Sequence, residues 1–107
     1  MHIDELLRKM MEQGASDLHL KVGQPPVIRI HGKLYSMEMA PFTQETLSNM
    51  LMAIIPPQMV SRFEEDRDLD FSYQVESGPR FRVNMFYQKG NTGAVFRQIP
   101  TDIPTLE

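Results

Sequence analysis

Two kinds of hydrophobic spacing open the chain and predict a helix followed by a strand. Between residues 3 and 11 apolar side chains recur every three or four positions, and Gly14 follows as a stop signal. This pattern predicts an amphipathic helix over about residues 2–13. From residue 17 to residue 22 apolar and polar side chains alternate strictly, which is typical of a strand with one buried face.

Short elements of both kinds are predicted in the middle of the chain. Residues 27–30 and 33–36 are predicted to form a hairpin that turns at His31-Gly32, where glycine accepts a positive φ angle. Thr43 is a good N-cap for a second helix. The apolar stripe of that helix consists of Leu47, Met50, Leu51, Ile54 and Ile55. Pro56-Pro57 ends the stripe and can open a third, short helix.

Strict alternation returns in the last third of the chain and predicts three longer strands. The first alternates over residues 69–75 and the second over residues 80–88, with a turn at residues 76–79 between them. Residues 89–93 contain two glycines and are predicted to form the next turn. A final strand is therefore expected over about residues 94–99.

The order of these elements predicts an α+β fold. One helix, three short strands, two helices and three longer strands give an antiparallel sheet of about six strands, with about three helices packed on one face. A chain of 107 residues has room for one hydrophobic core, and we assign residues 1–99 to it. Residues 100–107 contain two prolines and no periodicity, and are interpreted as the start of a linker.

Composition and charge argue against several classes of protein. Hydrophobic residues make up 41% of the chain and charged residues 23%, the balance of a globular domain. The formal net charge of −3 argues against nucleic-acid binding, which usually needs a basic domain. The lack of cysteine removes disulfides and thiolate zinc sites and favours a reducing compartment. No apolar run approaches the roughly 20 residues of a membrane span, so membrane insertion is not expected.

Common motifs for catalysis and metal binding are missing from the sequence. It contains no GxxxxGK[ST] and no GxGxxG segment, so the chain alone is not expected to cradle a triphosphate or to be an enzyme. The three histidines, at positions 2, 19 and 31, have no spacing that favours a metal, and no metal site is predicted. The acidic run over residues 64–68 is interpreted as a solvated helix end, with a docking surface for a basic partner as the alternative.

Three arginines on the predicted final hairpin need an explanation. Arg80 and Arg82 share the strand face opposite the apolar residues, and Arg97 has apolar neighbours two positions away on its own face. A guanidinium among apolar residues needs an anionic partner, because burying an unpaired charge is costly. That partner is either an internal carboxylate, such as Asp68 or Asp70, or a phosphate or carboxylate of a ligand.

Several short motifs occur in an order that resembles the start of a known family. GASDLHL begins at Gly14 and QPPVIRIHGKL at Gln24, and LDFSY, RFRVN and GAVFRQIP follow later. Together they are similar to the PilT family of type IV pilus retraction ATPases, within the type II/IV secretion ATPase superfamily. The resemblance covers essentially the whole chain. Pilus-assembly and type II secretion ATPases share weaker versions of the motifs, and the early position of GASDLHL favours the retraction branch.

The resemblance implies that the chain is the N-terminal domain of a larger motor protein. In the family this domain is PAS-like, which agrees with the predicted α+β order, and a RecA-like ATPase domain follows it. The family works as a cytoplasmic homohexamer in pilus retraction and twitching motility, at the pilus machinery of the inner membrane. Each N-terminal domain contacts its own RecA-like domain and a neighbouring subunit.

The resemblance also assigns a role to the arginines. In the family ATP, with Mg²⁺, is bound mainly by the RecA-like domain, and arginines of the N-terminal domain contact its phosphates at the domain junction. The matching positions are Arg82 in RFRVN and Arg97 in VFRQIP, with Arg80 as a further candidate.

A stand-alone PAS-type interaction or sensor module without a nucleotide role is the alternative. The two hypotheses differ in whether the reading frame continues past Glu107 into a GxxxxGK[ST] segment. The sequence leaves open whether the branch is retraction, accessory retraction or assembly.

Overall fold

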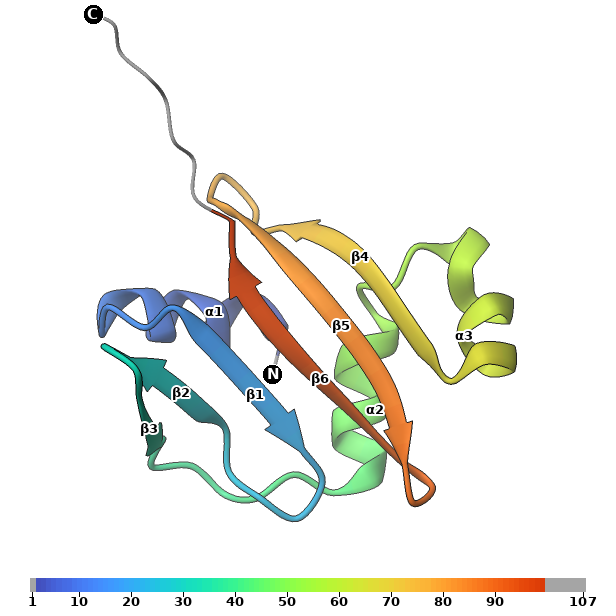
Figure 1. Ribbon diagram of the computed structural model, residues 1–107, viewed down its shortest axis with the longest axis horizontal. Helices are drawn as coiled ribbons and strands as arrows, with labels where there is room; N and C mark the ends of the chain where they lie inside the picture. The colour runs from blue at the N-terminus through green and yellow to red at the C-terminus, as the bar shows by residue number, and fades with distance from the viewer. Residues whose placement is uncertain (1, 100–107) are drawn as a thin grey trace, which may run out of the picture.

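The computed structural model describes residues 2–99, which form a six-stranded antiparallel sheet with three α-helices (Figure 1). In chain order the elements are α1 (Ile3–Glu12), β1 (Asp17–Lys21), β2 (Val27–Ile30), β3 (Lys33–Ser36), α2 (Gln44–Met52), the 3₁₀ turn η1 (Pro57–Met59), α3 (Val60–Asp66), β4 (Asp68–Gln74), β5 (Arg80–Gln88) and β6 (Asn91–Gln98). The predicted α+β fold is confirmed. The linker predicted over residues 100–107 lies outside the described residues.

The strand order β3-β2-β1-β6-β5-β4 brings the first and last strands together at the centre of the sheet. β1 and β6 pair antiparallel from Asp17 opposite Arg97 to Lys21 opposite Gly93. On one side of this pair β2 and β3 continue the sheet, and on the other side β5 and β4 do so. The sheet therefore consists of two three-stranded units joined by one strand pair.

One face of the sheet is apolar and is covered by helices, with α1 and α2 behind the strands in the view of Figure 1. The fully buried core side chains include Ile3, Leu6, Leu7, Met10, Leu47 and Leu51 from the helices and Leu18, Leu20, Phe81, Val83, Met85 and Phe96 from the strands. α3 packs beside β4, and the buried Phe63 stacks on Tyr87 with ring centroids 4.9 Å apart. Burial of each large apolar side chain in this core contributes about 1.5–3 kcal/mol to the free energy of unfolding.

The second helix begins where the sequence predicts and ends earlier. Thr43 caps α2 by accepting a hydrogen bond from the backbone N–H of Thr46 at 3.1 Å, and the Thr46 hydroxyl accepts in turn from the backbone N–H of Thr43. The helix stops at Met52, four residues before Pro56, because in a continued helix the proline ring would clash with the Met52 carbonyl and could donate no hydrogen bond to it. Ile55, predicted on the helix stripe, is still buried although it lies beyond the helix. No helix within residues 2–99 is long and apolar enough to cross a membrane.

Asp4 fastens α1 to the edge of the sheet. Its carboxylate accepts hydrogen bonds from the Tyr73 hydroxyl and, at 3.5 Å, from the backbone N–H of Glu76. Burial and the neighbouring carboxylate raise the pKa of Tyr73 above its ordinary value, so the hydroxyl keeps its proton and remains a donor.

The turn between β5 and β6 is shorter than predicted. β6 begins at Asn91, so Lys89 and Gly90 alone connect the strands, with φ angles of 55° and 79° that suit a tight two-residue hairpin. Gly93, predicted in the turn, lies in β6 opposite Phe86. The prediction was wrong because Gly93 serves packing: a Cβ there would lie 2.6 Å from Cε1 of Phe86.

We expect Gly93→Ala to destabilise the domain by about 1–3 kcal/mol, because the ring or the strand would have to shift. Urea unfolding of the 107-residue chain measures the change. In a Phe86→Ala background the nearest clash is gone, so the same glycine substitution should cost clearly less. Equal costs in the two backgrounds would contradict this account of Gly93.

Candidate functional site

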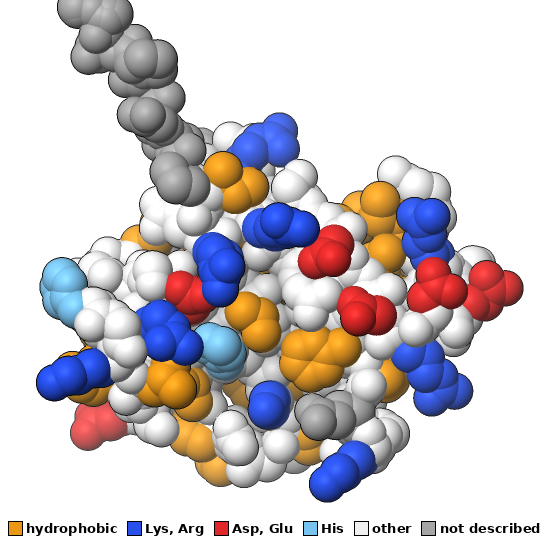
Figure 2. All heavy atoms as spheres, viewed as in Figure 1, with side chains coloured by type: hydrophobic (Ala, Val, Ile, Leu, Met, Phe, Trp, Pro, Cys, Tyr) orange, Lys and Arg blue, Asp and Glu red, His pale blue; other side chains and the backbone are white. Residues whose placement is uncertain are grey.

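The face of the sheet opposite the helices, called the open face here, carries most of the charged strand residues. In Figure 2, which has the view of Figure 1, basic, acidic and histidine side chains gather over the strands. Strand pairing and alternation put on this face Arg29 of β2, Asp17, His19 and Lys21 of β1, Gly93, Val95 and Arg97 of β6, Arg80, Arg82, Asn84 and Phe86 of β5, and Asp68, Asp70, Ser72 and Gln74 of β4.

Strand pairing lines up four charged residues across the middle of the open face. Arg29 lies opposite Asp17, Asp17 opposite Arg97, and Arg97 opposite Arg82. Side chains in such cross-strand pairs are direct neighbours, with Cβ atoms about 4.5–5.5 Å apart. This charged row contains three guanidinium groups and one carboxylate, so it is locally basic in a chain that is acidic as a whole.

Arg97 is ion-paired, although not to the partner that the sequence suggests. Its Nε donates to Oδ2 of Asp17 at 3.1 Å, while Asp68 and Asp70 accept hydrogen bonds from Nδ2 of Asn84. The prediction of Asp68 or Asp70 as the internal partner was wrong, because β5 separates β4 from β6. Although apolar residues lie two positions away along the strand, the side chain of Arg97 is 71% exposed.

Asp17 is the buried member of the ion pair. Burial raises the pKa of its carboxyl group, but hydrogen bonds from Ser16 and Arg97 and the charge of the guanidinium outweigh burial, so the pKa lies below its ordinary value of 3.8. Because the folded state lowers the pKa, this carboxylate stabilises the fold above about pH 4. That contribution is lost as the pH falls through the folded-state pKa.

Arg82 has no hydrogen-bond or ion-pair partner among residues 2–99, and it is exposed. Its strand neighbour Arg97 carries the same charge, an arrangement that is unfavourable unless an anion lies nearby. Arg80 lies two residues before Arg82 on the same face of β5, and its Nη1 donates a hydrogen bond to the Ser72 hydroxyl at 3.3 Å. The structure therefore brings Arg82 and Arg97 together and leaves Arg80 to one side of the pair.

A hollow of about 380 Å³ lies beside the two arginines on the open face. It is lined by His19, Asp70, Arg82, Asn84, Val95 and Arg97. Burial lowers the pKa of His19, so its ring is neutral at pH 7, and Nε2 has no hydrogen-bond partner within residues 2–99. The positive charge around this hollow therefore comes from the guanidinium groups, which suit a phosphate or carboxylate.

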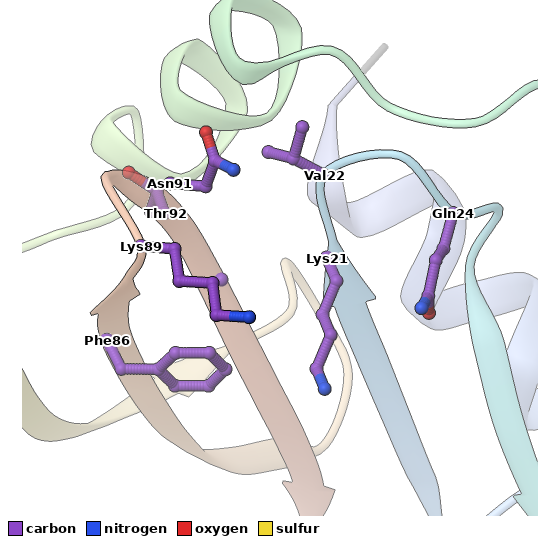
Figure 3. A pocket seen from close by; sticks show the side chains of 8 residues that line it. Lys21, Val22, Gln24, Phe86, Lys89, Asn91 and Thr92 are labelled. Carbon is purple, nitrogen blue, oxygen red and sulfur yellow. The ribbon is translucent and has the colours of Figure 1, made fainter.

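A second hollow, of about 340 Å³, continues the open face toward the β5–β6 turn (Figure 3). Lys21 lies on one side of it, Lys89 reaches from the turn toward β1, and Phe86 forms part of the wall. Among the described residues that line it, none is acidic. These lysines cannot be predicted as a cluster from the sequence, because exposed lysines far apart in the chain carry no signal until the strand order is known.

Comparison with known proteins finds close relatives, although no family model matches the chain. Over all 107 residues the chain is 41% identical to the type IV pilus retraction ATPase PilT of Pseudomonas aeruginosa and spans 31% of its length. It is 35% identical over the same residues to the type IV pilus ATPase PilU of that bacterium and spans 28% of its length. The chain thus spans about a third of these relatives.

Fold comparison leads to the same proteins. The crystal structure of the pilus retraction motor PilT with bound ADP matches with a TM-score of 0.89 and 34% identity, over 97% of this chain and 31% of that one. Sequence likeness along the whole chain and the shared fold agree. Over its whole length the chain is thus related in sequence and in fold to the N-terminal region of the PilT family of pilus retraction ATPases.

Proposed function

We propose that the chain is the domain of a hexameric pilus retraction ATPase that closes over ATP at the junction with a RecA-like domain. ATP and its Mg²⁺ would be held mainly by that second domain, with the open face of this one turned toward the phosphates. The matching retraction motor was crystallised with ADP, which supports a nucleotide as the ligand.

The observation that carries the proposal is the pairing of Arg82 with Arg97 on the open face. Two like charges are held side by side, and within residues 2–99 only one nitrogen of Arg97 and none of Arg82 has a partner. Guanidinium groups bind phosphate oxygens through parallel N–H groups, with both charge and geometry matched. In phosphoryl transfer such groups stabilise the charge that develops on the transferred phosphate.

The same proposal gives the domain its partners. It would contact its own RecA-like domain through the open face and a neighbouring subunit of a cytoplasmic homohexamer. This hexamer would act at the pilus machinery of the inner membrane, in retraction and twitching motility. Likeness to PilT and PilU over the whole chain supports this assignment.

The 107-residue chain by itself should neither hydrolyse ATP nor bind it tightly. The open face offers contacts to phosphates but the sequence has no phosphate-binding loop to cradle them. Millimolar ATP should therefore leave the melting temperature of the chain nearly unchanged, because only ligands that bind the folded state raise it. Micromolar affinity in a calorimetric titration of the chain would contradict this expectation.

Arg82→Ala and Arg97→Ala, made separately in the full-length protein, should each strongly lower the ATPase rate. An arginine that stabilises phosphoryl-transfer charge contributes up to roughly 10³–10⁵ in rate. The exposed, unpaired Arg82 should change stability by no more than about 0.5 kcal/mol when it is truncated. Arg97→Ala should cost more stability, because it removes a hydrogen bond from the buried Asp17.

Arg62→Ala is the matched control, since Arg62 is an exposed arginine on α3 away from the open face. It should leave both the rate and the melting temperature close to those of the unmodified protein. Full ATPase activity in both hairpin variants would sink the nucleotide role and favour an interaction or sensor module instead.

A further inference from the structure

We propose that Asp17 is a positioning residue, which holds Arg97 by its Nε so that the terminal nitrogens of the guanidinium are presented to phosphate. The inference rests on the proposed function of the open face. It adds a residue from β1 to a site that the family motifs assign to β5 and β6 alone.

Both oxygens of the Asp17 carboxylate are engaged by protein groups. Oδ1 accepts a hydrogen bond from the Ser16 hydroxyl at 2.6 Å, and Oδ2 accepts from Nε of Arg97 at 3.1 Å. The side chain of Asp17 is 7% exposed, against 71% for that of Arg97. A buried carboxylate that accepts a hydrogen bond on each oxygen has little freedom to move, so it can hold an exposed cation in a fixed position.

The atom by which Arg97 is held decides what remains available. A guanidinium carries five N–H groups in one plane, and the ion pair uses the single one on Nε. The terminal nitrogens of Arg97 donate no hydrogen bond to any of residues 2–99. A carboxylate that bound the terminal fork would block the site, whereas this one fixes the plane of the group and leaves the fork free.

Repulsion between neighbouring arginines makes an anchor necessary. Arg97 lies directly opposite Arg82, so without a counter-charge the two long side chains would be driven apart into solvent. Asp17 lies on the other side of Arg97, with Arg29 beyond it on β2 and the neutral His19 next along β1. Its charge offsets part of the repulsion and keeps the two forks adjacent before a ligand arrives, which is the form of preorganisation that speeds charge stabilisation.

The first measurement concerns the 107-residue chain and needs no nucleotide. The Nε–H group of Arg97 should give a protected signal in ¹⁵N NMR at neutral pH, and Asp17→Asn should broaden it or speed its exchange with water. Asp17→Glu, which keeps the charge, should restore part of the protection. Asp68→Asn is the control, because it makes the same chemical change on the open face without touching Arg97.

The second measurement is the ATPase reaction of the full-length protein. Misplacing one reacting group costs up to about 100-fold in rate, so Asp17→Asn should lower kcat by about 10–100-fold with little change in KM. Combining it with Arg97→Ala should add no further loss, because both changes would remove the same contact. If Asp17→Asn does not fold at the assay temperature, Ser16→Ala provides the same comparison with a smaller loss, since it removes only the hydrogen bond to Oδ1.

The outcomes separate this proposal from the function on which it rests. Full activity of Arg97→Ala alone would overturn the role of Asp17, and full activity of both Arg97→Ala and Arg82→Ala would overturn the proposed function as well. An inactive Arg97→Ala together with an unchanged Arg97 Nε–H signal in Asp17→Asn would overturn only the role of Asp17. Losses that multiply in the double variant would also overturn it, because Asp17 would then act by a route other than Arg97.

Discussion

The pairing of β1 with β6 is the constraint on which the rest of this fold depends. It brings together residues that are 80 positions apart in the chain and closes the two three-stranded units into one sheet. Closing so long a loop costs chain entropy, and the cost is met by the apolar side chains that the pairing buries under α1 and α2. The same pairing creates the charged row, because it sets Asp17 beside Arg97.

Alternation along the strands places apolar side chains on one face of the sheet and charged side chains on the other. In β6 Phe96 is fully buried in the core while its neighbour Arg97 points to the open face, and in β1 Leu18 and Asp17 are arranged in the same way. Stability therefore comes mainly from one face, while the other carries most of the charged strand residues. Asp17 is an exception to this division, because it lies on the open face and is nevertheless buried.

Much of this structure is predictable from the sequence because the signals are local. Period-2 and period-3.6 spacing gave the helices and strands, Thr43 marked the start of α2, and strand parity put Arg82 on the polar face. Strand order is not a local property, so the partner of Arg97 could not be identified. The contact between Asp4 and Tyr73 could not be predicted either, because it joins residues that are far apart in the chain.

Other misses came from residues that violate a simple rule. Gly93 looks like a turn residue, yet it lies within β6 because the ring of Phe86 needs its missing side chain. Lys89 takes a left-handed backbone conformation that would normally suggest asparagine or glycine. The family motifs pointed to Arg82 and Arg97, and strand pairing places these two residues opposite each other.

The central position of the last strand has a consequence for how the protein is made. A ribosome adds about 5–20 residues per second, so β6 emerges on the order of ten seconds after β1. Until then β1 and β5 each lack the strand with which they pair in the folded sheet, and an unpaired strand edge can pair with a wrong partner. The complete sheet thus requires its final strand, and a chain that ended before Asn91 would lack the only strand that joins the β1–β3 half of the described sheet to the β4–β5 half.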